Sequence, residues 1–555
     1  MTVKSHLLRL IPLFFLSGVL LSPDYVAAQA LIVSGGTSTN ISSGTNSYTG
    51  VQVGNQDSGN SLTISSAANV LVSAISYAGY QTVDGLSSNN SVLVTGSGSI
   101  LSNSANTYVG YVRSSDAGTT QPNSQNNSLT ISNGGEVIDN NGYVGFGANN
   151  NTGGVPGPIS TNNSALVTGS GSLWSNSSTL FIGGFTSAGS NGGTVSNNSL
   201  TISNGGEVID SIAEFGSTAA SKGNSVLVTG SGSLWSNSST LYLDAGGAGN
   251  NVTLANGGNV AAASLTLAAV HAPGTLNIGS LGGSDTAGVL SIGSSTITIT
   301  GAAANYAGTF NFNQTDTFVL SNAISSGYAV LHQFGSGTTI LSANNSNSGI
   351  TTVTNGTLLA ENLSGSAVGT GTLTVTNAGT LGGTGSIGQI STIASGGDLV
   401  PGVSGAGALS FTNGLTLSTG SMTTFLINAT NNFTSINLIG KTLTNGGALT
   451  FNITSYTAEV GDTFTVFNMT SGATESGDFS SVEVGSTFLT DASGIWSGTN
   501  NAGDSFVFTD SSGQLAVVAA PEPSTYALLG MSLGFLALVI AWRRRSSQSS
   551  LERKS

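Results

Sequence analysis

The sequence NNSLTISNGGEVID occupies Asn126–Asp139 and returns letter for letter at Asn197–Asp210. Weaker copies are NSLTISSAANV at Asn60–Val70 and NNVTLANGGNV at Asn250–Val260. A second unit, typified by SVLVTGSGSLWSNSSTLYLD from Ser225, alternates with the first along the chain. Repetition of short units is typical of solenoid proteins, in which each repeat contacts only its neighbours.

Each unit predicts one short β-strand followed by a tight corner. Leu200 and Ile202 alternate with Thr201 and Ser203, which is the period of a half-buried strand. The Asn-Gly-Gly or Gly-Ser-Gly that follows supplies the positive φ angles of a corner. Since one unit cannot bury its apolar stripe alone, we expect stacked units to share a core. The sequence therefore predicts an all-β fold, a right-handed parallel β-helix with roughly 20 residues per coil and about 4.8 Å per rung.

Composition and charge exclude several classes of protein. The 555 residues include 80 glycines, no cysteine and only 6% charged residues, unlike an ordinary globular enzyme. Between Leu31 and Ala520 there are three basic residues, Arg113, Lys222 and Lys441, against 21 acidic ones. Such a surface repels phosphate backbones, so nucleic acid is not an expected partner. Faces rich in hydroxyl and amide groups remain available for hydrogen bonds to sugars.

The amino end predicts a secretory signal peptide over residues 1–30. Lys4 and Arg9 precede an apolar stretch from residue 10 to 21, and Ala28, Gln29 and Ala30 form an A-x-A cleavage pattern. Cleavage after Ala28 fits nearly as well as cleavage after Ala30. A retained membrane anchor is the weaker interpretation, because about 20 apolar residues are needed to span a bilayer.

The repeats change in style from His271 onward. The stretch Gly335–Gln389, continued to Ala429, resembles the passenger-associated β-strand repeat of autotransporter proteins. The markers of this resemblance are Gly356-Thr357-Leu358-Leu359, Gly369-Thr370-Gly371, Gly382-Gly383-Thr384-Gly385 and Pro401-Gly402. The resemblance implies a parallel β-helix displayed outside the cell.

A different kind of segment follows these repeats. Short strands are expected at residues 449–453, 463–467 and 505–508, in a final β segment that caps the helix. We thus expect a signal peptide at 1–30, solenoid repeats at 31–270, autotransporter-like repeats at 271–437, the β cap at 438–520 and a sorting signal at 521–555.

The carboxyl end combines two prolines, an apolar run and three arginines. Ala527–Trp542 contains no charged residue, which predicts a C-terminal transmembrane helix if the run extends towards Pro523. Arg543, Arg544 and Arg545 would stay on the cytoplasmic side. Pro521 and Pro523 interrupt regular structure and leave Glu522 in an extended, accessible joint.

This ending resembles the PEP-CTERM sorting signal of Gram-negative bacteria. The resemblance implies that an exosortase-type enzyme recognises Pro521, Glu522 and Pro523 and cleaves near them, after transient anchoring in the inner membrane. Release or attachment at the outer surface, commonly alongside exopolysaccharide, would follow. The alternative is a simple tail-anchored protein, which has no need of the two prolines.

No residue pattern predicts an active site, metal or cofactor. Glu207 with Asp210, repeated as Glu136 with Asp139, is the most tempting carboxylate pair for glycoside hydrolysis. Residues three apart on a strand face opposite sides, so turn carboxylates are the favoured interpretation. His271 and His332 lack partners in any recognised arrangement. Asp462, Asp478 and Asp504 follow glycines and could belong to calcium loops, but turn aspartates are favoured.

Trp174 and Trp235 could serve as stacking platforms for sugars. Because Leu101 holds the matching position in the first copy, we expect these indoles in the core instead.

The sequence as a whole predicts an exported bacterial surface or matrix protein, structural or adhesive, without enzymatic activity and associated with extracellular polysaccharide. The alternatives are a β-helix polysaccharide-degrading enzyme and a membrane-retained adhesin.

Overall fold

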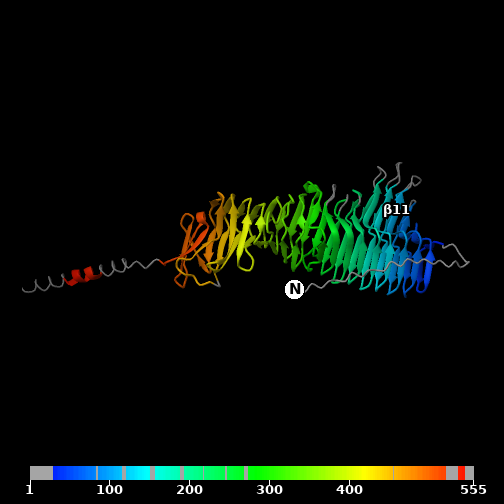
Figure 1. Cartoon of the computed structure of the whole chain (residues 1–555), viewed down its shortest axis with the longest axis horizontal. Helices are drawn as coiled ribbons and strands as arrows, with labels where there is room; N and C mark the ends of the chain where they lie inside the picture. The colour runs from blue at the N-terminus through cyan, green and yellow to red at the C-terminus, as the bar shows by residue number, and fades with distance from the viewer. Residues whose placement is uncertain are drawn as a thin grey trace, which may run out of the picture.

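The computed structural model describes residues 29–82, 85–114, 121–149, 157–187, 193–216, 218–243, 247–267, 273–453, 456–520 and 535–543. Within these ranges the chain winds into a rod of short strands, running from the amino end (blue) to the carboxyl end (orange) in Figure 1. Nearly all of the strand pairings along the rod are parallel, and the expected all-β solenoid, a parallel β-helix with a terminal β cap, is confirmed.

One ladder of parallel strands, here ladder 1, runs along the whole rod and gives the fold its continuity. Each of its strands pairs with the corresponding strand of the next coil, for example Ser128 with Ser164 and then Ser164 with Ser199. Its strands are β2 (Ser38–Ile41), β5 (Ser61–Ile64), β9 (Ser91–Thr95), β13 (Ser128–Ser132), β17 (Ser164–Thr168), β21 (Ser199–Ser203), β25 (Ser225–Thr229), β27 (Asn251–Ala255), β29 (Gly274–Ile278), β32 (Gly308–Phe312), β35 (Ala329–Gln333), β37 (Thr351–Val353), β39 (Thr372–Val375), β42 (Ile390–Ile393), β45 (Leu415–Leu417), β48 (Thr442–Asn445) and β52 (Thr474–Gly477).

The amino-terminal half adds three further ladders. Ladder 2 contains β3 (Thr45–Tyr48), β6 (Asn69–Val72), β10 (Ile100–Asn103), β14 (Glu136–Asp139), β18 (Leu173–Asn176), β22 (Glu207–Asp210), β26 (Leu234–Leu243), β28 (Asn259–Leu267) and β30 (Val289–Ile292). Ladder 3 contains β1 (Leu31–Val33), β4 (Val51–Asn55), β7 (Ser76–Gln81), β11 (Asn106–Ser114), β15 (Asn141–Asn149), β19 (Thr179–Ser187), β23 (Ile212–Phe215), the ends of β26 and β28, β31 (Thr296–Ile299) and β34 (Ala323–Ile324). Ladder 4 contains β8 (Leu86–Ser88), β12 (Asn123–Gln125), β16 (Ile159–Thr161), β20 (Thr194–Ser196) and β24 (Ser221–Lys222).

The carboxyl-terminal half has two other ladders beside ladder 1. Ladder 5 contains β33 (Thr317–Leu320), β36 (Thr338–Leu341), β38 (Thr357–Ala360), β40 (Thr380–Gly383), β43 (Asp398–Pro401), β46 (Met422–Ala429), β49 (Ala448–Asn452) and β53 (Ser481–Val484). Ladder 6 contains β41 (Ser386–Ile387), β44 (Gly407–Phe411), β47 (Asn432–Ile439) and β51 (Phe467–Thr470). Short 3-10 helices lie at Ala304–Tyr306 and Asp510–Ser512.

The length of a coil differs between the two halves. Ser91 pairs with Ser128 in the amino-terminal half, whereas Leu331 pairs with Thr351 in the carboxyl-terminal half, so the first of these coils is nearly twice as long as the second. The short coil expected from the sequence is therefore wrong for much of the amino-terminal half. The excess residues there form ladder 4 and lengthen the strands of ladder 3, such as β11, which is labelled in Figure 1.

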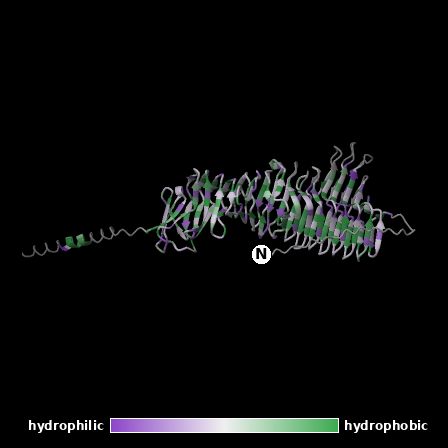
Figure 2. Ribbon diagram, viewed as in Figure 1, coloured by the Kyte–Doolittle hydropathy of each residue, from purple (hydrophilic) through white to green (hydrophobic). Residues whose placement is uncertain are grey.

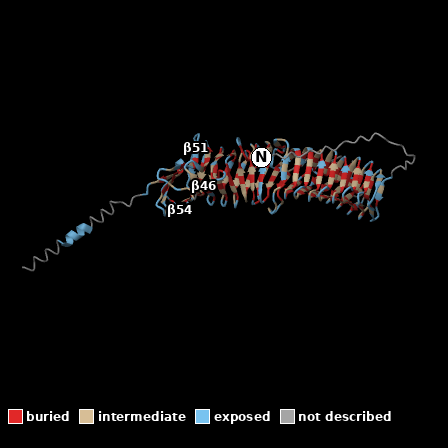
Figure 3. Cartoon of the chain, turned by 60° about the horizontal axis from the view of Figure 1, so that its bottom comes forward, coloured by how far each residue is buried: buried red, intermediate tan, exposed pale blue. Residues whose placement is uncertain are grey.

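The core is a stack of inward-facing side chains, with two from each of β9, β13 and β21 in ladder 1. In ladder 1 the residues alternate between half-buried and buried along β9, β13 and β21, as the period-two pattern predicts. Figure 2 shows hydrophobic residues recurring in coil after coil, and Figure 3 shows that buried residues alternate with less buried ones along the strands. One inward column of ladder 1 contains Leu62, Val92, Leu129, Ala165, Leu200, Val226 and Val252.

The corner between ladders 1 and 2 needs the glycines that the sequence supplies. Asn133 and Gly134 have φ angles of 52° and 82°, in the left-handed region. A Cβ atom on Gly135 would lie 2.4 Å from the carbonyl oxygen of Val94 in the preceding coil. The Asn-Gly-Gly motif is thus required by backbone geometry and by the close approach of adjacent coils.

The two kinds of repeat unit alternate so that large residues stack on small ones. Val137 pairs with Trp174, Trp174 with Val208, and Val208 with Trp235. Both indoles are fully buried, which confirms that Trp174 and Trp235 belong to the core. Each identical repeat therefore contacts the other kind of unit on both sides.

The carboxyl-terminal end of the rod is closed by an antiparallel sheet. Its strands, in spatial order, are β50 (Thr463–Thr465), β58 (Gln514–Val518), β57 (Ser505–Thr509), β56 (Ile495–Thr499) and β55 (Thr490–Asp491). An additional short strand, β54 (Thr487–Phe488), pairs with β53 and is labelled in Figure 3. The parallel ladders themselves continue to β52 and β53, beyond the boundary expected at residue 437.

The described part of the carboxyl end contains one α-helix at residues 535–543. None of the helices among the described residues is long and apolar enough to cross a membrane. Much of the apolar run expected to form a transmembrane helix, residues 527–534, lies outside the described residues.

Candidate functional site

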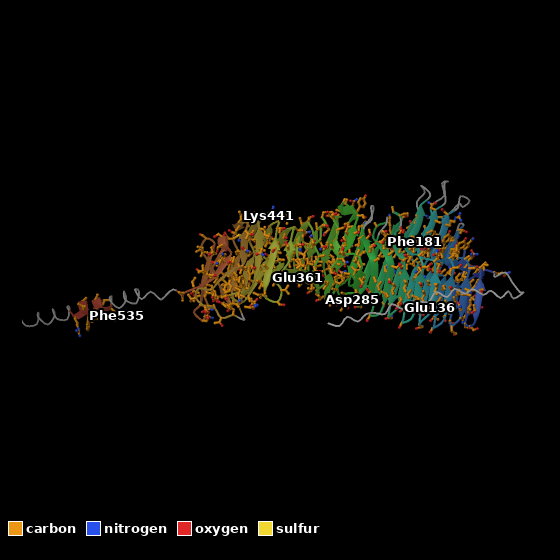
Figure 4. All side chains as sticks on the ribbon, viewed as in Figure 1. Glu136, Phe181, Asp285, Glu361, Lys441 and Phe535 are labelled. Carbon is orange, nitrogen blue, oxygen red and sulfur yellow. The ribbon has the colours of Figure 1, made fainter. Side chains whose placement is uncertain are left out.

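Seven aromatic side chains form a continuous surface on ladder 3, which we call the aromatic platform. They lie on four consecutive coils, on β7, β11, β15 and β19. They are Tyr77, Tyr80, Tyr108, Tyr111, Tyr143, Phe146 and Phe181. All are half-buried except Tyr108, which is 8% exposed. Phe181, at one end of the platform, is labelled in Figure 4.

The rings are arranged in two parallel columns. In the first, centroid distances are 5.3 Å from Tyr77 to Tyr108, 4.3 Å from Tyr108 to Tyr143, and 4.8 Å from Tyr143 to Phe181. In the second, Tyr80 and Tyr111 are 5.4 Å apart, and Phe146 lies 5.6 Å beyond. Ring planes within a column are within 17° of parallel. Most ring faces are therefore used against other rings, and the platform presents ring edges and phenol hydroxyls.

A glycine between the two aromatic positions makes this arrangement possible. Tyr77 and Tyr80 are both half-buried, while Ala78 and Gly79 between them are both buried. The alternation of inward and outward side chains is therefore interrupted by one extra buried position in the middle of the strand. Gly79 has a φ of 82°, and Gly110 and Gly145 have φ angles of 81° and 75°. A left-handed residue at this point lets residues three apart both face outward.

The same glycines leave room for a buried row of asparagines, which we call the asparagine spine. Its members are Asn60, Asn90, Asn127, Asn163, Asn198, Asn224 and Asn250, all at most 2% exposed. A Cβ atom on Gly110 would lie 2.2 Å from Cγ of Asn163, and one on Gly145 would lie 2.2 Å from Cγ of Asn198. The glycine of each platform strand thus packs directly against the side chain of a spine asparagine.

Hydrogen bonds join each spine residue to the next. The backbone N–H and the Nδ2 of Asn127 both donate to Oδ1 of Asn163, each at 3.0 Å. Asn163 donates in the same way to Asn198, and Asn198 to Asn224. Because these groups are fully buried, loss of the Asn163 acceptor would leave the backbone N–H of Asn127 unsatisfied, whereas Nδ2 of Asn127 also donates to Ser124 and to the carbonyl oxygen of Ser87.

Serines of ladder 4 complete the polar corner. Nδ2 of Asn163 donates to Oγ of Ser160 at 3.1 Å, and that hydroxyl donates to the carbonyl oxygen of Gly110 at 2.7 Å. The corresponding bonds of Asn90 to Ser87 and of Ser87 to Gly54 are 3.1 and 2.9 Å long. The spine therefore fixes the backbone that carries the aromatic residues.

The outer surface of the platform is polar at its edges. Nδ2 of Asn106 donates to the hydroxyl of Tyr108 at 3.2 Å, and Nδ2 of Asn141 donates to Oδ1 of Asn106 at 3.0 Å. Burial and the neighbouring Tyr108 raise the pKa of Tyr111 to about 12, although Arg113 acts in the opposite direction. Burial likewise raises the pKa of Tyr77 and of Tyr143. These three hydroxyls remain protonated and can both donate and accept.

Sequence reasoning did not identify either the platform or the spine. The platform could have been found from YAGY at Tyr77–Tyr80, YVGY at Tyr108–Tyr111 and YVGF at Tyr143–Phe146, since each has the same spacing around a glycine. The spine could have been found from a triplet that recurs where strands of ladder 1 begin, as at 89–91, 126–128 and 249–251. Its first residue is Asn or Gly, its second is the spine Asn, and its third is Ser or Asn. The first residue of this triplet has positive φ at Asn89, Asn126 and Gly249.

The carboxylate pairs considered from the sequence do not form a paired site. Glu136 is half-buried and Asp139 is buried, and the same holds for Glu207 and Asp210, as expected for residues three apart on a strand. The interpretation of Asp139 and Asp210 as turn carboxylates is wrong, because both end a strand and face the core. Their burial is compensated by the tryptophans of the next coil.

Each buried aspartate accepts a hydrogen bond from an indole. Nε1 of Trp174 donates to Oδ2 of Asp139 at 3.0 Å, and Nε1 of Trp235 donates to Oδ2 of Asp210 at 2.8 Å. Burial raises the pKa of Asp139 to about 7 and that of Asp210 to about 8, and the indole bonds only partly oppose this. These groups stabilise adjacent coils and have no access to a substrate.

The remaining candidate residues are placed as follows. His332 is half-buried and stacks on Phe334 at 4.9 Å, and burial lowers its pKa. His271 lies outside the described residues. Asp462 accepts a bond from the N–H of Glu459, and Asp504 accepts one from Nδ2 of Asn500, as turn aspartates do. In the described part of the chain no three acidic or histidine side chains are grouped to hold a metal.

The processing residues lie largely outside the described part of the structure. Pro521, Glu522, Pro523, Arg544, Arg545 and Ala28 all belong to the undescribed residues. Ala30 is exposed and immediately precedes β1, and Arg543 is the last residue of the described helix. Their expected roles in sorting, topology and cleavage remain predictions.

Comparison with known families matches residues 519–545 to the PEP-CTERM protein-sorting motif. The chain carries a PEP-CTERM sorting motif. The matched range includes the Pro-Glu-Pro sequence, the apolar run and the three arginines, in the order expected from the sequence. This motif covers only the carboxyl-terminal region and says nothing about the rod.

Two further similarities concern the rest of the chain. An adhesin, BmaC autotransporter of Brucella suis biovar 1 (strain 1330), is 46% identical over 92 residues, which is 17% of this chain. The match spans only 3% of the length of that curated relative. Among solved structures, a hyper-glycosylated TibA fragment is 15% identical, covering 69% of this chain and 93% of the fragment, with a TM-score of 0.21.

Proposed function

We propose that this chain is an exported surface or matrix protein whose rod adheres to extracellular polysaccharide through the aromatic platform. The observation that carries the proposal is the double column of seven rings, spread over four coils. The match to an adhesin autotransporter and the sorting motif support display outside the cell.

The chemistry of the platform favours a neutral glycan. Phenol hydroxyls and the amides of Asn106 and Asn141 offer both donors and acceptors, which suit sugar hydroxyls. The body carries 21 acidic residues against three basic ones between residues 31 and 520, so polyanions would be repelled. Aromatic residues recur at every rung, about 4.8 Å apart, so an extended chain lying along the rod would meet many weak contacts.

Binding can be tested with the exported protein purified from its host and fractionated polysaccharides. Replacing Tyr80, Tyr111 and Phe146 with Ala removes one column and should reduce co-sedimentation with a neutral glycan at least about 10-fold. Tyr242→Ala is the control for loss of an outward-facing tyrosine of ladder 3, because Tyr242 lies in line with the first column but beyond Glu214, away from the platform. Equal binding by both variants would contradict the proposal.

Variants that keep the stacked rings but lack hydroxyl groups distinguish the role of the rings in packing from the role of the hydroxyls in glycan binding. Tyr→Phe substitutions at positions 80 and 111 keep both ring columns and remove two hydroxyls. We expect unchanged unfolding and weaker glycan binding. The appearance of new reducing or unsaturated ends in the same incubations would instead favour a polysaccharide-degrading enzyme.

We further propose that an exosortase-type enzyme processes the chain near Pro521, Glu522 and Pro523, after transient anchoring in the inner membrane. Support comes from the match of residues 519–545 to the sorting motif. Mass spectrometry of the mature carboxyl terminus should find it near Glu522. An intact Ser555 on the surface protein would contradict processing and favour a membrane-retained adhesin.

A further inference from the structure

The junction between the last parallel rung and the antiparallel cap contains an acidic pocket. The strands of this junction lie at the orange end of the rod in Figure 1. Glu475 on β52, Asp478 just after it, Gly494 before β56 and Asp510 after β57 line a pocket of about 300 Å³. Two parts of the fold that are far apart in sequence therefore bring carboxylates to one place.

The sequence around this pocket is strongly acidic. Residues 456–520 include eight acidic residues and no Lys or Arg. Glu475, Asp478 and Asp491 all act on Asp510 as like charges. Like charges in a partly enclosed pocket destabilise one another unless a cation or a proton intervenes.

Asp510 differs from the other buried aspartates. It is 5% exposed, and neither of its carboxylate oxygens has a hydrogen-bond partner. Its backbone N–H donates to the carbonyl oxygen of Gly494 at 3.0 Å, so the residue is held firmly beside the pocket. Asp139 and Asp210, by contrast, each have one oxygen bonded to an indole.

The surroundings of Asp510 disfavour an ionised carboxylate that has no partner. Burial is the main cause that raises the pKa of Asp510 to about 7, and the neighbouring acids raise it further. The indole of Trp496 faces the same carboxyl and lowers its pKa, but at a geometry that makes no hydrogen bond. Two buried oxygens thus remain without a donor.

We propose that this pocket binds a divalent cation, with Ca²⁺ as the preferred ion and Asp510 and Glu475 as carboxylate ligands. Ca²⁺ takes six to eight oxygen ligands from carboxylates, carbonyls and water. Thr509 and Ser511 also line the pocket, and their side chains carry hydroxyl oxygens. Since no three acidic side chains among the described residues are grouped in advance, water and small side-chain movements complete the shell.

The expected affinity is that of an extracellular module, in the range of about 10⁻⁴ to 10⁻³ M. A cation held by residues of β52, β57 and the turn before β56 would link the cap to the last rung. Calcium would thereby fasten the closed end of the rod, a role separate from glycan binding at the aromatic platform.

Thermal unfolding of the full chain in increasing Ca²⁺ tests the proposal. Saturating Ca²⁺ should raise the unfolding temperature of the cap by about 2 to 4 °C. Asp510→Asn should abolish this shift, whereas Glu483→Gln should keep it, because Glu483 lies on β53 outside the pocket. No shift in the unaltered protein, or an equal shift in both variants, would overturn the proposal.

Terbium luminescence provides a second readout that does not depend on the stability of Asp510→Asn. Tb³⁺ bound in the pocket should be sensitised by Trp496, and added Ca²⁺ should quench the emission by competition. Trp496→Phe should remove the emission while preserving the calcium-dependent shift. Emission that persists in Trp496→Phe would place the ion elsewhere and overturn this site.

Discussion

The amino-terminal and carboxyl-terminal halves of the rod share ladder 1 but build their coils differently. In the amino-terminal half Asn127 bonds to Asn163 of the next long coil, and a buried polar spine runs beneath the aromatic platform. In the carboxyl-terminal half Leu373 pairs with Ser391 across a coil about half as long. Glycines bring adjacent coils into direct backbone contact in both halves. A Cβ atom on Gly371, for example, would lie 2.0 Å from the carbonyl oxygen of Gly349.

This difference shows what the extra residues of a coil contribute. The short coils consist mainly of the strands and corners that stack on the neighbouring coils. Long coils add ladder 4, which supplies serines that accept hydrogen bonds from the spine. The same serines donate to the carbonyl oxygens of the glycines between the platform rings. The candidate binding surface is therefore a product of coil length, and it can be tested separately from the fold that both halves share.

The largest expected effect comes from a methyl group at a platform glycine. Gly145→Ala places a Cβ atom 2.2 Å from Cγ of Asn198 in a left-handed backbone position, which should cost about 4 kcal/mol of unfolding free energy. Gly59→Ala is the control, because Gly59 also has positive φ but has open space around it. It should cost about 1 kcal/mol. Denaturant unfolding followed by Trp174 and Trp235 fluorescence measures both, and similar losses would show that backbone strain alone matters.

The next largest effect is a pH dependence of the amino-terminal half, where the pKa values of two buried aspartates are raised. Because Asp139 and Asp210 have pKa values raised to about 7 and 8, the folded state holds protons that the unfolded chain, with a pKa of about 3.9, releases. Stability should therefore be greatest below about pH 4 and fall by about 3 kcal/mol as the pH rises to 8, since local relaxation around each carboxyl reduces the full linkage value.

The double substitution Asp139→Asn and Asp210→Asn should flatten this dependence while each Asn still accepts the indole bond. Glu136→Gln is the control, since Glu136 faces outward. Unfolding at pH 5 and pH 8, again followed by tryptophan fluorescence, measures the effect. A profile unaffected by the double substitution would refute the assignment to these two carboxyls.

Loss of one spine residue should have an intermediate effect. Asn163→Ala removes the acceptor of two buried donors on Asn127, which should cost about 2 kcal/mol. Asn468→Ala in the carboxyl-terminal half is the matched control, because its bond to Asn437 is exposed. That change should cost under about 0.5 kcal/mol. If the two losses were equal, the spine would contribute no more than a surface contact.

The smallest expected change in stability is at the platform surface. Tyr111→Phe preserves the stacking with Tyr80 and Phe146 and should change the unfolding free energy by less than about 0.5 kcal/mol. Tyr111→Ala interrupts the column and should cost about 1 to 2 kcal/mol. Calorimetry of the two variants distinguishes stacking from hydroxyl contributions.

The fold could be predicted because its determinants are local and repeated. Leu200 and Ile202 alternate with polar residues, and Asn133-Gly134-Gly135 can only form a corner, so strand and turn follow from short windows. The core position of Trp174 could be predicted because Leu101 occupies the equivalent position in another copy of the repeat. The coil length did not follow, because it depends on which distant strands pair.

The platform and the spine were missed for the same reason. Tyr77 and Tyr108 are far apart in sequence and become neighbours only through pairing of β7 with β11. Asn127 was indistinguishable from the many other asparagines until its place beneath Gly79 was known. Asp139 was assigned to a turn because its partner, Trp174, belongs to the following coil.

The alternation of unlike units has a consequence for how such a rod can evolve. Duplication of a single coil would place indole against indole, or leave a buried carboxyl without its N–H donor. Duplication of a pair, which is the interval at which Asn126–Asp139 recurs as Asn197–Asp210, preserves both contacts. Genes for rods of this kind should therefore gain and lose coils two at a time.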